Sequence, residues 1–175
     1  DRAGLVGADG ETHHGCFDAL YLSQVPHMTV LCPASFAELR QMLRRAVLEL
    51  TGPVAVRYPR GGEGAYQDCC GNETFTLVRP GADCTILTYG VLINEALAAA
   101  ELLHEAGVET RVVKLNAIAP LDGDAVLAAL GSEKRLLVLE DCVGSGCVGQ
   151  RLTAILAQRG RMPERLILKN LGDTI

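Results

Sequence analysis

The feature that most constrains the fold is a regular alternation, after residue 83, of short apolar runs with longer runs whose apolar residues recur every three or four positions. The short runs have the length of buried strands, and the longer ones have the period of amphipathic helices. Strands are predicted over 84–89, 109–115, 135–139 and 165–169, and helices over 91–106, 123–130 and 148–159. This order requires crossover connections, so we predict an α/β fold with mainly parallel sheets and helices on both faces.

An incomplete version of the same pattern precedes residue 61. Strands are predicted over 28–32 and 54–58, with an amphipathic helix between them. Ser35 and Glu38 form a capping-box pattern at the start of that helix. Two strands and one or two helices cannot cover both faces of a parallel sheet, so this part is interpreted as the back half of a larger domain.

The segment between these two parts is rich in Gly and polar residues, a composition typical of a linker. We therefore divide the chain into a partial domain over 1–61, a linker over 62–82 and a second domain over 83–175. The chain starts at Asp1 rather than Met and stops at Ile175, directly after a strand-like stretch and a turn. We expect it to be a fragment of a longer protein, with the second domain truncated at its end.

Charge and apolar content argue against several classes of function. The net charge of −5 makes a broad cationic surface for nucleic acid or anionic lipid improbable. No apolar run reaches the roughly 18 residues of a membrane span, so we expect an intracellular, cytoplasmic protein with no membrane partner. Seven cysteines without a C-x-x-C pair argue against a disulfide framework or a zinc ribbon. We expect reduced thiols, with a labile disulfide between Cys142 and Cys147 as the alternative.

The strongest local signal is the opening segment 1–16, which lacks apolar periodicity and concentrates Gly, Asp, Arg and His. Loops of this kind often carry binding and catalytic groups, and glycines let the backbone approach a ligand. His13 is a candidate for proton transfer, because an imidazole titrates at about pH 6.5. The alternative is a surface histidine without function.

A second signal is Arg60, which follows the predicted strand 54–58 and precedes Gly61 and Gly62. Ligand crevices lie at the carboxyl ends of parallel strands, and a planar guanidinium suits phosphate. Arg60 is therefore a candidate anion-binding residue, with a solvated arginine at a domain edge as the alternative.

Residues 144–149 fit the dinucleotide pattern G-x-G-x-x-G between a predicted strand and a predicted helix. The acidic residue that should follow about 20 positions later is missing, because Lys169 and Asn170 stand there. We prefer a tight strand-to-helix turn, which Glu140 and Asp141 are expected to cap. A dinucleotide-binding oxidoreductase is the alternative.

Several strings of the sequence resemble one enzyme family in order and spacing. They are DRAGLVGADGETHHG, FDALYL, VLCPASFAELRQML and GPVAVRYPRG, followed later by GADCTILTYG, VKLNAIAPLD, LLVLED and LGDTI. In these strings the chain is similar to the 1-deoxy-D-xylulose-5-phosphate synthases, which are transketolase-like thiamine-diphosphate enzymes. The first four strings are specific to that family, and the others are shared with transketolases. The resemblance implies the back half of a pyrimidine-binding domain over 1–61 and a transketolase C-terminal-like domain over 83–175.

The resemblance also implies a reaction and a set of site residues. With thiamine diphosphate and Mg²⁺, the family condenses pyruvate with glyceraldehyde 3-phosphate and releases CO₂, toward isoprenoid, thiamine and pyridoxal precursors. Arg2 and Arg60 match the family's arginines for the aldehyde's phosphate. His13 matches its active-site histidine near the thiazolium and pyruvate, and Asp9 matches a catalytic acid of the same loop. A homodimer is implied as well.

Two expected features of that family have no counterpart in the sequence. They are the Gly-Asp-Gly…Asn motif for magnesium and the glutamate that activates the cofactor's aminopyrimidine. The resemblance therefore implies that the sites of both cofactors lie mostly outside this chain, and that the fragment alone is inactive. The alternatives are a transketolase, a 2-oxo-acid dehydrogenase of the β type, or a non-catalytic remnant that keeps only a dimerisation surface.

Overall fold

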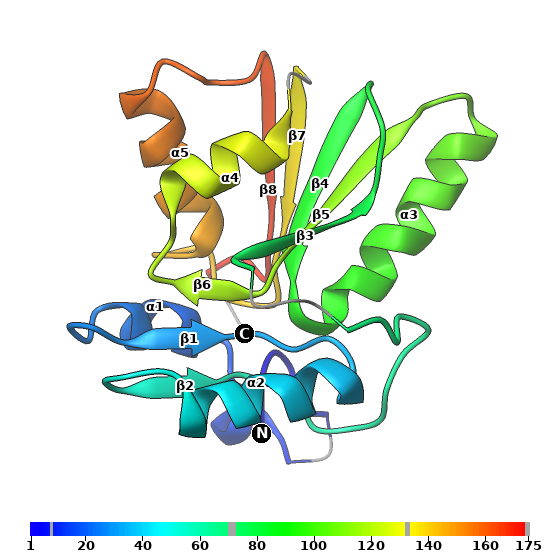
Figure 1. Ribbon diagram of the computed structural model, residues 1–175. Coiled ribbons are helices and arrows are strands. Elements are labelled where there is room, and N and C mark those ends of the chain that lie inside the picture. Colours follow the sequence, from blue (N-terminus) through cyan, green and yellow to red (C-terminus); the bar gives the residue numbers. More distant parts are fainter. Residues whose placement is uncertain (8, 70–72, 132–133, 174–175) are drawn as a thin grey trace.

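A five-stranded sheet forms the centre of the second part of the chain (Figure 1). The computed structural model describes residues 1–7, 9–69, 73–131 and 134–173. The strand order is β3-β5-β4-β7-β8, and each neighbouring pair is parallel except β3 with β5. The predicted α/β fold with mainly parallel strands is confirmed. The strands are β3 (Phe75–Arg79), β4 (Cys84–Tyr89), β5 (Thr110–Leu115), β7 (Arg135–Leu139) and β8 (Arg165–Lys169).

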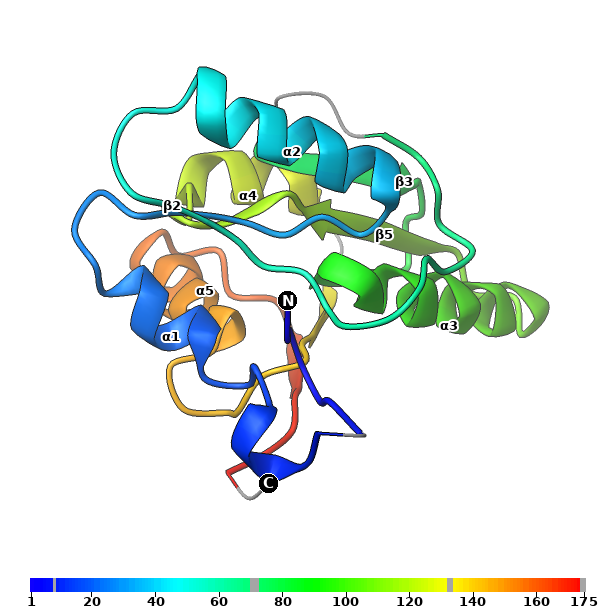
Figure 2. The same cartoon turned by 90° about the horizontal axis from the view of Figure 1, so that it is seen from below.

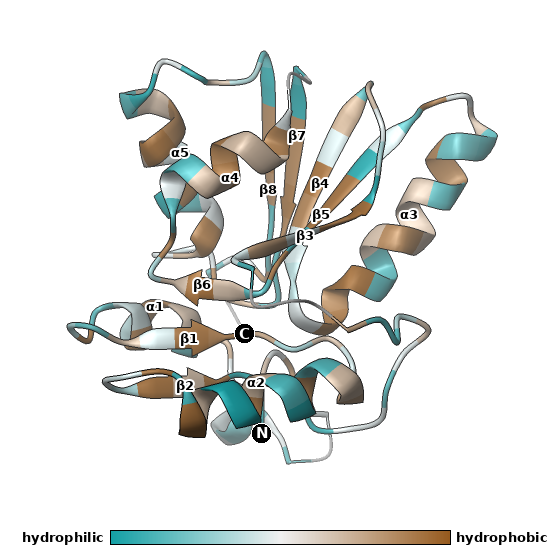
Figure 3. Ribbon diagram, in the orientation of Figure 1, coloured by the Kyte–Doolittle hydropathy of each residue, from teal (hydrophilic) through white to brown (hydrophobic). Residues whose placement is uncertain are grey.

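Helices cover both faces of this sheet. Successive residues of a strand point to opposite sides, so neighbouring residues of β4 pack against different helices. Ile86 of β4 belongs to an apolar cluster with residues of α3 (Ile93–Glu105). Its neighbour Leu87 belongs to another cluster, with residues of α4 (Gly123–Leu130) and α5 (Val148–Gln158). Figure 3 shows that β7 is predominantly apolar, as expected for a strand buried on both faces.

A smaller sheet of order β2-β1-β6 lies below the first in Figure 1. Strands β1 (Thr29–Leu31) and β2 (Val54–Val56) are parallel, and β6 (Ala117–Ala119) runs antiparallel to β1. Sequence analysis did not predict β6, because three residues are too few to show a strand period. The second part of the chain therefore supplies a strand to the sheet of the first part.

Strand β3 lies in the segment that sequence analysis interpreted as a linker. It pairs antiparallel with β5 at the edge of the large sheet, with Phe75 opposite Leu115. The interpretation of 62–82 as a plain linker was wrong for this stretch, because five strand-forming residues were outweighed by the surrounding glycines and polar residues. The division into a partial domain, a linker and a second domain otherwise stays a prediction.

Helix α2 (Phe36–Leu48) starts at the predicted capping pattern. The Ser35 hydroxyl oxygen accepts a hydrogen bond from the Glu38 backbone N–H at 3.1 Å, and Glu38 Oε2 accepts from the Ala34 N–H at 2.8 Å. The short helix α1 (Asp18–Ser23), which sequence analysis did not place, precedes β1. Among the helices of the described residues, none combines the length and apolar content needed to cross a bilayer.

A fully buried ion pair joins α2 to the large sheet. Lys114 Nζ of β5 lies 3.0 Å from Glu38 Oε1, and both side chains have 0% exposure. The Tyr66 hydroxyl donates to Glu38 Oε1 at 3.1 Å, and the Asn116 carboxamide oxygen accepts from Lys114. Buried charges are tolerated only when they are paired and hydrogen-bonded, so this cluster fixes how the two sheets lie against each other.

Candidate functional site

A cavity of about 530 Å³ contains both predicted phosphate-binding arginines. Arg2 reaches it from the opening loop and Arg60 from the segment after β2. Val91, which follows β4 closely, also lines it, so the cavity lies at the carboxyl ends of β2 and β4, where ligands of parallel sheets bind. Figure 2 looks onto this end of the molecule, with the amino terminus near its centre.

A second cavity of about 370 Å³ contains the predicted catalytic histidine. His13 lies at the end of the short 3₁₀ helix η1 (Glu11–His13) and lines this cavity. Asp1, Arg2 and Tyr58 line both cavities. The structure therefore brings Arg2, Arg60 and His13 to one place, with Arg2 between the two cavities.

Asp9 lies in the first cavity and forms an ion pair with Arg60. It is absent from the lining of the second cavity, which holds His13. Its hydrogen bond with the Arg60 guanidinium lowers the pKa of the Asp9 carboxyl below its ordinary value. The Asp9 carboxylate is therefore held in its charged form, as an anion on the arginine that we predict to bind phosphate.

The two adjacent histidines make different contacts. His13 Nδ1 lies 2.8 Å from the Thr12 hydroxyl, which leaves Nε2 as the ring nitrogen open to a ligand. His14 Nδ1 accepts a hydrogen bond from the Val6 N–H at 3.0 Å, so the proton of a neutral His14 ring is on Nε2. Sequence analysis gave His14 no role, yet it lines the second cavity beside His13. Nothing in the sequence distinguished the two.

Sequence analysis also missed Arg57, whose side chain is 2% exposed. Its Nε lies 2.8 Å from Asp18 Oδ1, and its Nη1 lies 2.8 Å from Asp141 Oδ1. Its guanidinium carbon is 5.5 Å from the centre of the Tyr89 ring. Arg57 thus joins the end of β2, helix α1 and the loop after β7.

The glycine-rich turn at 144–149 does not present an open helix terminus. Glu140 Oε2 accepts from the Val148 N–H and Oε1 from the Gly149 N–H, both at 2.8 Å. These are the N–H groups that a dinucleotide phosphate would need at the start of α5. Glu140 caps this helix, as predicted, and removes the basis for a dinucleotide site. The same prediction was wrong for Asp141, because its carboxylate pairs with Arg57 instead.

The cysteines of the described residues are in the thiol form, including Cys142 and Cys147. Burial raises the pKa of the Cys32 thiol to about 12, whereas Cys69 is exposed. Because the thiolate is the reactive species, we expect iodoacetamide at pH 8 to label Cys69 well before Cys32. Peptide mass mapping at timed intervals measures this order, and labelling in urea serves as the control. Equal rates at Cys32 and Cys69 in the native protein would contradict this burial pattern.

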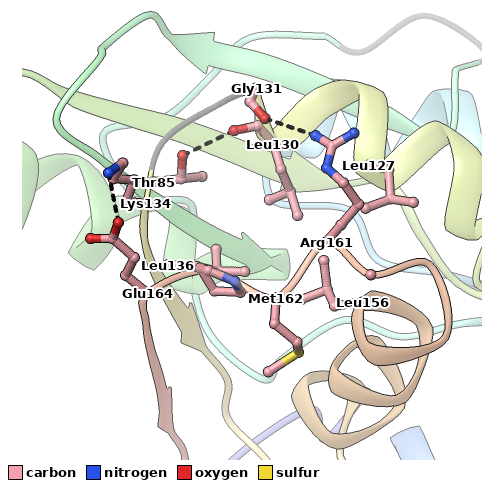
Figure 4. A pocket seen from close by; sticks show the side chains of 12 residues that line it. Thr85, Leu127, Leu130, Gly131, Lys134, Leu136, Leu156, Arg161, Met162 and Glu164 are labelled. Carbon is pink, nitrogen blue, oxygen red and sulfur yellow. Dashed lines mark hydrogen bonds and ion pairs between the residues drawn. The ribbon is translucent and has the colours of Figure 1, made fainter.

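A third cavity, of about 350 Å³, lies at the amino ends of β4, β7 and β8 (Figure 4). Its polar groups already have partners within the chain: Lys134 pairs with Glu164 at 2.6 Å, and the Thr85 hydroxyl donates to the Leu130 carbonyl at 3.3 Å. None of the predicted site residues lines it. Within the described ranges, no group of three or more His, Cys, Asp or Glu side chains is arranged to hold a metal ion.

The fold and the site together define a class. Two sheets with a shared core place basic and imidazole side chains at the carboxyl ends of their strands, which is typical of an α/β protein that binds its ligand at that edge. The family model "Transketolase, C-terminal domain" matches residues 74–170, and "Transketolase, pyrimidine binding domain" matches residues 1–62. The chain belongs to the transketolase family.

Several 1-deoxy-D-xylulose-5-phosphate synthases are among the curated relatives. The chain is 40% identical over 154 residues to 1-deoxy-D-xylulose-5-phosphate synthase of Lysinibacillus sphaericus, which covers 85% of the chain and 24% of that protein. Identity to the synthase of Shouchella clausii is 37% over 177 residues, which covers 98% of the chain and 28% of that protein. The chain thus spans about a quarter of the length of these relatives.

Solved structures support the fold. A split-gene transketolase, described as an inactive β4 tetramer, superposes with a TM-score of 0.82 at 24% identity, over 93% of this chain and 54% of that one. A transketolase of Pichia stipitis in complex with sedoheptulose 7-phosphate superposes with a TM-score of 0.71 at 19% identity, over 97% of this chain and 24% of that one.

Proposed function

We propose that this chain is the substrate-binding part of a 1-deoxy-D-xylulose-5-phosphate synthase, which condenses pyruvate with glyceraldehyde 3-phosphate and releases CO₂. One observation carries the proposal: a cavity with two arginines adjoins a cavity with His13, and Arg2 lines both. This arrangement suits an acceptor that has a phosphate at one end and a reacting carbonyl at the other. The identities of about 40% to synthases of that name support the same reaction.

The residues present fit only one end of thiamine diphosphate. The second cavity is lined by His13 and by the half-exposed rings of Phe17 and Tyr21, which suit a flat heterocycle. The described residues offer no cluster of metal ligands for Mg²⁺. We therefore assign the diphosphate and Mg²⁺ to parts of the longer protein other than the residues described. When bound, the cofactor supplies the electron sink for the carbon–carbon bond changes.

The side chains of this chain position the acceptor and manage its charge. Arg2 and Arg60 bind the phosphate dianion through charge-assisted hydrogen bonds, and the phosphate displaces the Asp9 carboxylate from Arg60. This places the aldehyde carbonyl over the second cavity, beside His13. His13 Nε2 then donates a proton to the aldehyde oxygen as negative charge develops there.

The longer protein is proposed to act as a homodimer in the cytoplasm, in the supply of isoprenoid precursors. Exposed apolar side chains support an assembly, because a monomer rarely leaves such groups together on one helix. On α2, Leu43, Val47 and Leu48 are 45%, 77% and 65% exposed. Light scattering of the full-length protein tests this, and a monomer at micromolar concentration would contradict it.

Arg60→Ala in the full-length protein is expected to raise the KM for glyceraldehyde 3-phosphate by about 10-fold to 10²-fold, because a charge-assisted contact contributes about 1.5–3 kcal/mol. The KM for pyruvate should change much less, since pyruvate carries no phosphate. Steady-state kinetics with each substrate varied in turn measure both constants. Arg159→Ala is the matched control, because Arg159 pairs with Asp124 at the exposed surface. Equal increases in the two KM values would refute the phosphate assignment.

A further inference from the structure

His13 projects from a loop whose two ends meet at a pair of glycines, and Arg2 lies just before this loop. The Gly4 N–H donates to the Gly15 carbonyl at 3.2 Å, and the Gly15 N–H donates to the Gly4 carbonyl at 2.9 Å. Arg2 lies two residues before Gly4, and His13 lies two residues before Gly15. The position of this glycine pair therefore determines the backbone positions of Arg2 and His13.

Only glycine fits at the two positions of this pair. Gly4 has a φ of 72°, a left-handed conformation that other residues rarely adopt. A Cβ at Gly15 would lie 2.0 Å from the carbonyl oxygen of Arg2, so the backbone of Arg2 passes directly over Gly15. The close approach leaves the pair little freedom to shift on its own.

The glycine pair is held by contacts with Arg57 and with the second part of the chain. Arg57 Nη2 donates to the Gly15 carbonyl at 2.9 Å, and its Nη1 pairs with Asp141 at 2.8 Å. A Cβ at Gly4 would lie 2.8 Å from Asp141 Oδ2, which shows how closely this carboxylate packs on the loop. The Val143 N–H also donates to the Cys16 carbonyl at 3.0 Å.

We propose that Arg57 and Asp141 are positioning residues, which hold the Gly4–Gly15 pair so that Arg2 meets the phosphate of the acceptor. The inference rests on the proposed function and extends it, because it gives the loop after β7 a part in substrate selection. Asp141 lines neither cavity, and Arg57 lines the second cavity but not the one that holds Arg60. Both act through the backbone that carries Arg2 and His13.

Physical reasons favour this role over a simple stabilising one. Arg57 donates hydrogen bonds to the Asp18 carboxylate and the Gly15 carbonyl through Nε and Nη2, and its Nη1 forms an ion pair with Asp141. A guanidinium fork can make all three contacts at once, which the single ammonium group of a lysine cannot. Burial raises the pKa of the Asp141 carboxyl in spite of the neighbouring Arg57. An amide at 141 has nearly the shape of the carboxylate, although it pairs with Arg57 more weakly.

The experiment uses the full-length protein and two acceptors, glyceraldehyde 3-phosphate and unphosphorylated glyceraldehyde. The measured quantity is the ratio of kcat/KM for the first acceptor to kcat/KM for the second. Asp141→Asn and Arg57→Lys should each lower this ratio by roughly 10-fold or more, because a displacement of about 1 Å in a positioning group can cost 10²-fold. Asp124→Asn, at an exposed ion pair, is the matched control and should leave the ratio unchanged.

The ratio separates positioning from folding, because a variant with fewer folded molecules loses activity on both acceptors equally. Retention of the wild-type ratio by both Asp141→Asn and Arg57→Lys would overturn the inference. If one of these variants does not fold, the ratio of the other variant tests the inference. Arg2→Ala tests the underlying proposal separately. If Arg2→Ala keeps the wild-type ratio, the proposed phosphate contact is wrong. If Arg2→Ala lowers the ratio while Asp141→Asn and Arg57→Lys keep it, only the positioning inference is wrong.

Discussion

Replacement of Lys114 by methionine is expected to lower the free energy of unfolding by about 3–5 kcal/mol. Glu38 lies 3.0 Å from Lys114 Nζ with no exposed side-chain surface, so the substitution leaves a buried carboxylate without its counter-charge. The Tyr66 hydroxyl and the Ala34 N–H still donate to Glu38, but neutral donors offset only part of the cost of burying the charge. Urea unfolding of the 175-residue chain at pH 7, followed by circular dichroism, measures the change.

Two further variants test this explanation. Lys134→Met breaks the ion pair with Glu164, whose side chains are 71% and 67% exposed, and should cost less than about 1 kcal/mol. The double variant Glu38→Gln with Lys114→Met removes both charges and should be more stable than Lys114→Met alone. A loss for Lys114→Met as small as that for Lys134→Met would show that the buried pair does not hold the sheets together.

His13→Ala is expected to lower the kcat of the full-length protein by about 10²-fold, a typical effect of removing a general acid or base. The Thr12 hydroxyl orients the ring through Nδ1, and Nε2 remains available in the cavity that we assign to the reacting carbonyl. The KM for glyceraldehyde 3-phosphate should change less, since the phosphate contacts come from the arginines. Initial rates at saturating concentrations of both substrates measure kcat.

His104→Ala is the matched control for this experiment. His104 forms an exposed pair with Glu109 at the end of α3, away from both cavities, and its replacement should leave kcat within about twofold. A His13→Ala protein that turns over at the wild-type rate would refute the catalytic assignment. His14→Ala then becomes the next test, because His14 lines the same cavity.

Local patterns in the sequence were sufficient to predict the fold class. The strands at 84–89, 135–139 and 165–169 and the helix at 123–130 have the predicted bounds. These elements are continuous in the chain, and their periods depend only on which residues face the core. The capping pattern at Ser35 and the glycines that follow Arg60 are local signals of the same kind.

The sequence by itself thus determined the α/β class, most of the elements and the loop that carries Arg2, Asp9 and His13. Only the tertiary structure decided which distant groups meet: β6 with β1, Arg57 with Asp141, and Glu38 with Lys114. Each of these contacts joins residues far apart in the chain. The sequence around one partner has no period or composition that indicates which residue the other partner is. The physical reason is that pairing of buried strands and charges is set by how the two sheets pack, a property of the whole chain rather than of any segment.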